Sequence, residues 1–179
     1  VVTNIAAITV GNIAGYNTMV LTNGGRLYST GAANIGNTGS NNTVQVAGGG
    51  ALWSVGAQAL TVGSSGAGTN NLLLIDGQGV VGGAVVTNIA AITVGSTAGN
   101  NKMTLTNGGW LQSAGAAVIG NVASNNSVLV SGGGAAWNVG VQGLTVGTGG
   151  TATNNLLLID GQGLVGGARV SNVLTLAIG

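Results

Sequence analysis

The amino-acid sequence predicts an all-β protein built as a parallel β-solenoid (a β-helix), with three short strands per coil and about six coils of about 28 residues. Two observations carry this prediction. Residues 1–84 and 85–168 align without a gap and are identical at 61 of 84 positions. Within each repeat a shorter unit recurs, in which variable and unchanged positions alternate. We therefore expect one continuous solenoid domain with super-repeat one at 1–84, super-repeat two at 85–168, and the start of a third repeat at 169–179.

The composition favours strands over helices. The chain has 37 Gly, no Pro, no Cys, no His and only five charged residues, while 45% of its residues are hydrophobic. Gly, Asn, Thr and Val are weak helix formers, and no apolar stripe with helical spacing persists between the glycines. Low charge combined with high apolar content also argues against disorder. The chain is expected to bury a core between strands that are separated by Gly and Asn turns.

The short unit begins with an Asn, continues through two alternating apolar positions and reaches a glycine cluster. It reads NTMVLTNGGRLYSTG at 17–31, NTVQVAGGGALWSVG at 42–56 and NLLLIDGQGVVGG at 71–83. A short apolar phrase ending in Gly precedes each copy, for example ITVG at 8–11 and LTVG at 60–63. A unit of this size cannot bury its own apolar face, but stacked units share one continuous core.

The differences between the two super-repeats predict which side chains point inward. In residues 16–21 the even positions change between the copies, whereas Asn17, Met19 and Leu21 recur; residues 26–31 and 42–47 also alternate. A period of two is that of a β-strand, whose successive side chains point to opposite faces. The predicted inward set, with its equivalents 84 residues later, is Ile8, Val10, Met19, Leu21, Leu27, Ile35, Val44, Val46, Trp53, Val55, Leu60, Val62, Leu73 and Ile75.

One polar residue recurs at the same place in all six units. This column consists of Asn17, Asn42, Asn71, Asn101, Asn126 and Asn155, and the residue before it is Tyr16 in the first unit and Asn in the others. Stacked asparagines can pass amide hydrogen bonds from coil to coil, so we expect a structural asparagine ladder. The alternative is that each Asn only permits a turn with positive φ.

The repeat phrase resembles the passenger-associated repeat of bacterial autotransporter proteins and related secreted β-helix proteins. The matching stretches are LTVGSSGAGTNNLLLIDGQG at 60–79, ITVGSTAGNNKMTLTNGGWL at 92–111 and LTVGTGGTATNNLLLIDGQG at 144–163. The looser pattern covers essentially the whole chain. This resemblance implies a parallel β-helix that is exported and displayed extracellularly or at the cell surface.

The sequence offers little for catalysis, and we expect a protein that is not an enzyme and needs no cofactor or metal. Hydrolysis of sugars requires two carboxylates about 5–9.5 Å apart. The only two, Asp76 and Asp160, are equivalent residues three coils apart, each in an IDGQG turn where it is expected to bond nearby backbone amides. Without His or Cys, nucleophilic triads and thiolate metal sites are excluded.

Several binding functions are also disfavoured. Three isolated cations do not form a nucleic-acid interface. Every apolar run is broken within a dozen residues, so no membrane insertion is expected. Ice binding by a rank of Thr residues is weakened because Asn34 and Val118 interrupt it. Asn41 and Asn125 lie in N-x-T and N-x-S sequences and are formal glycosylation acceptors.

The expected partner is the protein itself. The string VVTNIAAITVG opens the sequence, recurs at 85–95, and returns in altered form as RVSNVLTLAIG at 169–179. Coils that stack head to tail through terminal coils grow into filaments, because such contacts do not close. The sequence therefore predicts a filament-forming subunit or a section of a longer array. A surface display stalk or adhesin that binds glycans or surfaces is the alternative.

Overall fold

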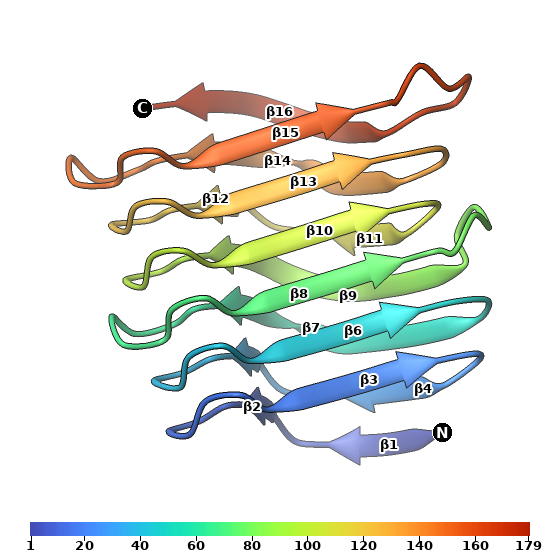
Figure 1. Ribbon diagram of the computed structural model, residues 1–179, viewed down its shortest axis with the longest axis horizontal. Coiled ribbons are helices and arrows are strands. Elements are labelled where there is room, and N and C mark those ends of the chain that lie inside the picture. The colour runs from blue at the N-terminus through green and yellow to red at the C-terminus, as the bar shows by residue number, and fades with distance from the viewer.

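The computed structural model describes residues 1–179 and consists of strands joined by turns, with no helix. Figure 1 shows the strands lying one above another from the N-terminus to the C-terminus. The six-stranded sheet contains β3 (Thr18–Thr22), β6 (Thr43–Ala47), β8 (Leu72–Asp76), β10 (Lys102–Thr106), β13 (Ser127–Ser131) and β15 (Leu156–Asp160). Consecutive strands of this sheet pair in parallel and without a register shift.

The second sheet has ten strands and forms the other two sides of each coil. It contains β1 (Val2–Ile5), β2 (Ile8–Val10), β4 (Arg26–Ser29), β5 (Ala33–Ile35), β7 (Ala51–Val62), β9 (Ala84–Val94), β11 (Trp110–Ser113), β12 (Ala117–Ile119), β14 (Ala136–Val146) and β16 (Arg169–Ile178). All of its pairings are parallel as well. The predicted all-β parallel solenoid of about six coils is therefore confirmed.

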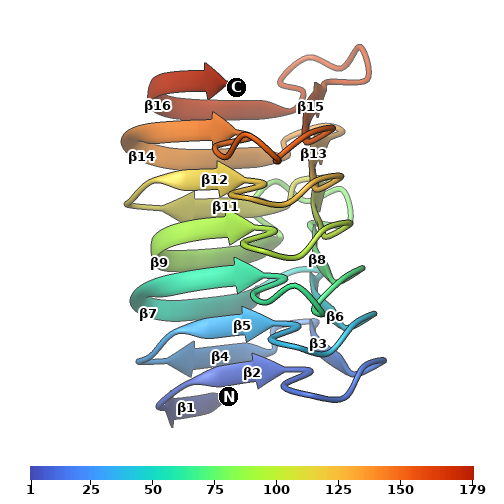
Figure 2. The same ribbon diagram turned by 90° about the vertical axis from the view of Figure 1, so that its left-hand side faces the viewer.

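Three straight segments make up each coil, although two of them often belong to one bent strand. The first half of β7 pairs with β4 and its last three residues pair with β5. The strand bends between these halves at Gly56 and Ala57, which both have positive φ. Figure 2 shows the long strands β7, β9 and β14 turning this corner, whereas β4 and β5 are separate strands.

The core consists of columns of apolar side chains that run along the solenoid. On the six-stranded sheet, Leu21, Val46, Ile75, Leu105 and Val130 lie in register, one per coil, and are at most 9% exposed. Burying a side chain of this size contributes roughly 1.5–3 kcal/mol, and each column adds one per coil. The coils are therefore held together by aliphatic stacking in the interior.

The predicted inward set is buried except in the first and last coils. Met19 and Leu157 are only partly buried against the core, and Ile159, although it lies in register with the buried Val130, is 45% exposed. These residues have a neighbouring coil on one side only. Their equivalents in the middle coils, Met103, Leu73 and Ile75, are fully buried, so the stacked neighbour determines burial.

Two tryptophans fill the interior at equivalent places but differ in hydrogen bonding. Trp53 and Trp137 are both fully buried. The indole N–H of Trp137 donates to Ser113 Oγ at 3.4 Å, whereas that of Trp53 has no partner. Ser29, which is equivalent to Ser113, donates instead to the carbonyl of Ser54. An unpaired buried donor costs about 1–3 kcal/mol, so super-repeat one carries a local penalty that super-repeat two avoids.

Candidate functional site

The most regular polar feature of the molecule is the column of six asparagines, which we call the asparagine ladder. The side-chain Nδ2 of each of the first five donates to Oδ1 of the asparagine in the next coil, at 3.0 Å for Asn17 to Asn42, 2.9 Å for Asn42 to Asn71 and 3.1 Å for Asn71 to Asn101. The steps from Asn101 to Asn126 and from Asn126 to Asn155 measure 3.4 and 3.2 Å. All five steps therefore run in one direction along the solenoid.

Every ladder asparagine except Asn17 also accepts a backbone hydrogen bond through its Oδ1. The N–H of Asn42 donates to Asn71 Oδ1 at 2.9 Å, and the other four steps repeat this bond at the same distance. The side chain turns back as well, as when Asn71 Nδ2 donates to the carbonyl of Gly68. Asn42, Asn71, Asn101 and Asn126 are at most 1% exposed. Polar groups this deeply buried require hydrogen-bond partners, and the neighbouring asparagines of the ladder provide them.

The positive-φ turn proposed as the alternative lies one residue earlier. Tyr16, Asn41, Asn70, Asn100, Asn125 and Asn154 have φ between 54° and 62°, whereas no ladder asparagine has positive φ. Asn adopts the left-handed region more readily than other residues with a side chain. The Asn-Asn pair thus combines two roles: its first residue turns the chain, and its second bonds to the next coil.

A column of glycines makes room for the ladder. Gly11, Gly36, Gly63, Gly95 and Gly120 end the short apolar phrases, and each has φ between 73° and 78°. A Cβ atom at Gly63 would collide with the side-chain amide of Asn101, and the other four would collide with the ladder asparagine of the following coil. The phrase ending in Gly and the Asn of the next unit are therefore one packing motif that spans two coils.

The two carboxylates lie apart and serve the turns. Asp76 pairs in register with Thr106, which pairs with Ser131 and then Asp160, so three strand spacings of about 4.8 Å separate the two aspartates. Oδ1 of each accepts the N–H of the residue two positions later, Gln78 or Gln162, at 2.9 Å. This bond within the turn is the one predicted from the IDGQG phrase. No three His, Cys, Asp or Glu side chains gather anywhere in the chain.

A shallow polar groove runs beside the positive-φ corners. Asn41, Thr43, Asn70, Leu72, Asn100 and Lys102 line it, together with ladder residue Asn71. Asn70, Asn100 and Lys102 are exposed, and Asn41 is half-buried. Amide, hydroxyl and ammonium groups beside an apolar side chain can hydrogen-bond the hydroxyls of a glycan. The groove is the feature that best matches the predicted glycan-binding alternative.

The formal glycosylation acceptors lie at the same corners. Asn41 and Asn125 have φ of 59° and 61°, and neither side chain forms a hydrogen bond within the chain. Asn125 is exposed and Asn41 is half-buried beside Thr69, whose carbonyl accepts the Asn41 N–H. Of the two, Asn125 therefore presents the more accessible amide, and its modification stays a prediction.

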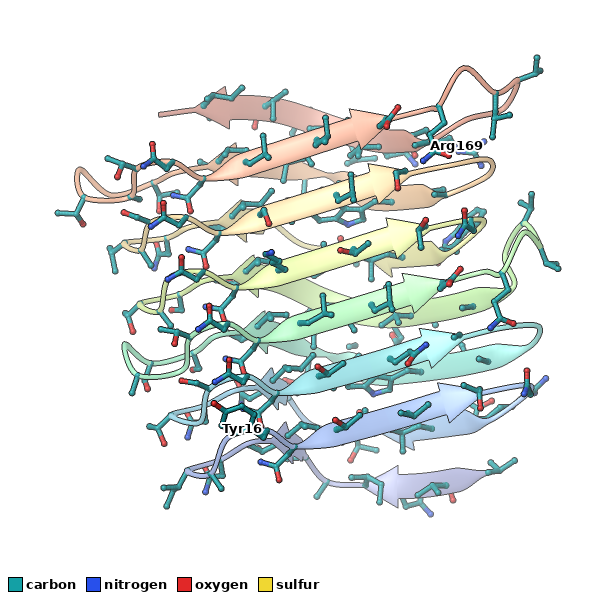
Figure 3. The ribbon with its side chains drawn as sticks, in the orientation of Figure 1. Tyr16 and Arg169 are labelled. Atoms are coloured by element: carbon teal, nitrogen blue, oxygen red, sulfur yellow. The ribbon has the colours of Figure 1, made fainter.

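Three aromatic side chains lie on the outer surface of the solenoid. Tyr16 is 83% exposed, and Tyr28 and Trp110 are half-buried on the ten-stranded sheet. The Arg169 guanidinium lies 6.0 Å from the centroid of the Trp110 ring, and the small Ala136 lies between them. Figure 3 shows that Tyr16 and Arg169 are far apart on the molecule. These residues do not form a shared aromatic platform.

The rank of threonines considered for ice binding lies on one face of the ten-stranded sheet. Thr61 and Thr93 pair directly, but Asn34 lies between Thr9 and Thr61, and Val118 lies between Thr93 and Thr145. The interruption predicted from the sequence is therefore present, and adjacent coils provide only one Thr–Thr step.

No protein-family model matches the chain, and no curated protein and no solved structure is significantly similar to it. The resemblance to the passenger-associated repeat therefore rests on the quoted motifs alone. None of the molecule is helical, so it includes no helix with the length and apolar character needed to cross a membrane.

Proposed function

We propose that the chain is a non-catalytic structural β-solenoid of the cell exterior, whose coils stack head to tail into a filament or a long array. The observation that carries this proposal is the uniform contact between coils. Successive ladder asparagines are separated by 25, 29 or 30 residues, yet every step has the same backbone bond of 2.9 Å. Coils of different length therefore present the same stacking surface, and that surface can be repeated indefinitely.

The last coil supports the proposal because it exposes side chains that the middle coils bury. Leu176 and Ile178 are 57% and 78% exposed, whereas their equivalents Ile92 and Val94 are at most 1% exposed. The backbone edge of β16 that faces away from β14 also lacks a paired strand. A further coil would cover these apolar side chains and pair this edge, whether it came from the same chain or from another copy.

A joint between two copies has a defined geometry. In a joint that keeps only one of the two equivalent segments 1–11 and 169–179, Asn155 would donate to Asn17 of the second copy, and Gly147 would accommodate that asparagine as Gly63 accommodates Asn101. The chain passes along the ten-stranded sheet seven times (β1 with β2, β4 with β5, β7, β9, β11 with β12, β14 and β16) but crosses the six-stranded sheet only six times. Directly abutted copies would therefore leave one strand position of the six-stranded sheet unfilled.

Because of this mismatch, residues 169–179 would not complete the register at a joint between two whole chains. These residues and residues 1–11 are equivalent, so a gap-free joint needs only one of the two segments. A variant comprising residues 1–168 has two whole super-repeats and should stack without a vacancy. We therefore expect this variant to form filaments at lower concentration than the chain of 179 residues.

Electron microscopy and fibre diffraction test the filament proposal. The expected result is unbranched rods with a reflection near 4.8 Å along the rod axis, formed more readily by the 1–168 variant. A matched control is the 1–168 variant carrying Asn155→Asp, which removes the amide donor at the joint, keeps an oxygen acceptor for Asn126, and should form fewer rods. Monodisperse monomers of both lengths at high concentration, seen by sedimentation, would remove the filament form of the proposal.

A display stalk or glycan-binding adhesin is the second candidate, because the groove at the positive-φ corners presents Asn70, Asn100 and Lys102 to solvent. A glycan array with the intact protein tests it. Lys102→Thr is the natural control variant, since Thr18 occupies the equivalent place in super-repeat one. Saturable binding that falls in this variant would support the adhesin, and no saturable binding to any glycan would contradict it.

A further inference from the structure

The outer face of the six-stranded sheet carries apolar side chains that the fold does not require. The third residue of each strand points outward, and register places these residues in one column along the solenoid. From the first coil to the last, the column reads Val20, Gln45, Leu74, Thr104, Leu129 and Leu158. This sheet faces the viewer in Figure 3, with its outward side chains drawn as sticks.

Four of these six residues are apolar, although neither the core nor the backbone demands it. Val20 and Leu158 are 52% and 45% exposed, and Leu74 and Leu129 are half-buried. Gln45 and Thr104 occupy the same position in the coils on either side of Leu74, so a polar residue is compatible with this position of the strand. Leu72 and Leu156 add an apolar side chain at the first outward position of their strands. The phrase LLLID thus places a pair of outward leucines every three coils, about 14 Å apart.

The charged side chains of this face lie along its opposite margins. Lys102 is the first residue of β10, whereas Asp76 and Asp160 are the last residues of β8 and β15. Lys102 pairs in register with Leu72, four residues before Asp76, so about 13 Å of strand separates the two charges. Neither carboxylate of the face can therefore neutralise Lys102 within the chain.

A second copy can neutralise these charges in one relative orientation. A two-fold axis parallel to the solenoid axis reverses the strand direction, so the Lys102 margin of one copy faces the Asp76 margin of the other, one strand spacing away. The middle column then faces itself, leucines included. An arrangement with opposed solenoid axes would set the Lys102 margin against the same margin of its partner, which is unfavourable.

We propose that the outer face of the six-stranded sheet is a lateral interface, at which two copies of this chain pack face to face with parallel solenoid axes. The face measures about 29 Å by 16 Å, so about 460 Å² per copy is covered. Stable interfaces cover about 800 Å² per partner. A pair of single chains is therefore weakly associated, and about ten coils reach the stable range. Lateral pairing is independent of axial stacking, but it strengthens as an array lengthens.

The leucines of the middle column provide the first test. The triple variant L74Q/L129Q/L158Q introduces the residue that coil two already has, so the fold is expected to persist, as circular dichroism would check. Sedimentation equilibrium of the intact chain at millimolar concentration should show at least tenfold weaker association for this variant. Tyr28→Gln is the matched control: it also places a Gln at an outward position, but on the ten-stranded sheet, where residue 112 is naturally Gln, and it should leave association unchanged.

Cysteine cross-linking tests the relative orientation, and the chain has no cysteine of its own. With parallel axes, the middle column of one copy faces the same residues of the other. Gln45→Cys and Thr104→Cys should therefore each form a disulfide-linked dimer on oxidation, whereas Tyr28→Cys should not. With opposed axes, residue 45 of one copy would lie several coils from residue 45 of the other, and Gln45→Cys would not cross-link efficiently.

Charge changes provide an independent check. Lys102→Asp places a carboxylate opposite the Asp76 margin and should weaken pairing about fivefold. Thr106→Lys places a second cation opposite Lys102 and should also weaken pairing. The double variant K102D/T106K restores opposite charges across the axis and should recover wild-type association.

The proposal is overturned if the leucine variant associates like the wild type, or if Thr106→Lys strengthens pairing, as opposed axes require. Axial rods that form normally in all these variants would leave the proposed function intact.

Discussion

At the scale of single residues, the Asn-Asn pair determines both the turn at the coil corner and the hydrogen bonds to the next coil. Asn70 takes the left-handed conformation, and Asn71 accepts two hydrogen bonds from Asn42 and donates to the next coil. The sequence identified the recurring asparagines by their position. It could not separate the turn from the ladder, because both roles select Asn and the two residues are adjacent. Tyr16 is the informative exception, since it replaces the turn residue and not the ladder residue.

Removing a buried ladder residue should destabilise the protein strongly. Asn71→Ala leaves the backbone N–H and the side-chain amide of Asn42 without their acceptor, in a place that is at most 1% exposed. Two unpaired buried donors and the lost side chain should lower the free energy of unfolding by about 3–5 kcal/mol. Asn17→Ala is the control, because Asn17 is exposed and accepts no hydrogen bond from another coil; its cost should be about 1 kcal/mol or less. Urea denaturation followed by circular dichroism measures both free energies. Equal costs for the two variants would contradict the conclusion that the buried ladder hydrogen bonds stabilise the protein.

The turn residue gives a prediction of the opposite sign. Tyr16 has φ of 62°, a conformation that costs a bulky side chain more than Asn. Tyr16→Asn makes the first corner like the other five and should raise the free energy of unfolding by about 0.5–1 kcal/mol. The reverse change in super-repeat two, Asn100→Tyr, should lower it by a similar amount. Thermal unfolding of the two variants checks the signs, and a shift in the same direction for both would refute this account of the corner.

At the scale of secondary-structure elements, alternation between the two super-repeats predicted the inward side of the strands in residues 16–21, 26–31 and 42–47. It worked because solvent-facing positions vary freely while core positions do not. It missed Ile89 and Val86, which are at most 1% exposed. Both lie in VVTNIAAITV, which is identical in the two copies, so no contrast distinguished inward from outward there. The same identity concealed that this segment forms one bent strand, β9, in super-repeat two.

Glycines at the ends of the apolar phrases should be much less replaceable than other glycines with positive φ. Gly63→Ala combines a φ of 77° with a collision against the amide of Asn101, whereas Gly24 has a φ of 82° and nothing within 4 Å of an added Cβ. Gly24→Ala should therefore cost about 1–2 kcal/mol from backbone strain alone. Gly63→Ala should cost at least twice as much, because it also displaces a ladder side chain. Denaturant midpoints of the two variants compare them directly, and similar midpoints would show that the Asn101 side chain moves aside at little cost in free energy.

At the scale of the whole molecule, the solenoid behaves as a one-dimensional stack in which each coil contacts only its neighbours. The same register connects β3, β6, β8, β10, β13 and β15, and the exposure of the inward side chains of these strands rises only in the terminal coils. Stability should then increase with the number of coils, because interior contacts accumulate while the two end surfaces stay constant. Fold and stacking were predictable from the repeat, since periodicity is a property of sequence. The groove and the lateral face were not, because they depend on which side chains share an outer surface.

Lengthening the chain tests this stacking model directly. A second copy of residues 85–168 inserted after residue 168 keeps every coil contact and adds three coils, so the length along the solenoid axis should grow by about 14 Å while the cross-section stays constant. Small-angle X-ray scattering measures both quantities. The denaturation midpoint should rise, because the end coils become a smaller share of the structure. A control insert with Gly147→Val in the original repeat disrupts the seat of the new ladder asparagine, and should lose most of the gain in stability. An unchanged length along the solenoid axis, or two separate unfolding transitions in the unmodified insert, would mean that the added coils fold as an independent body.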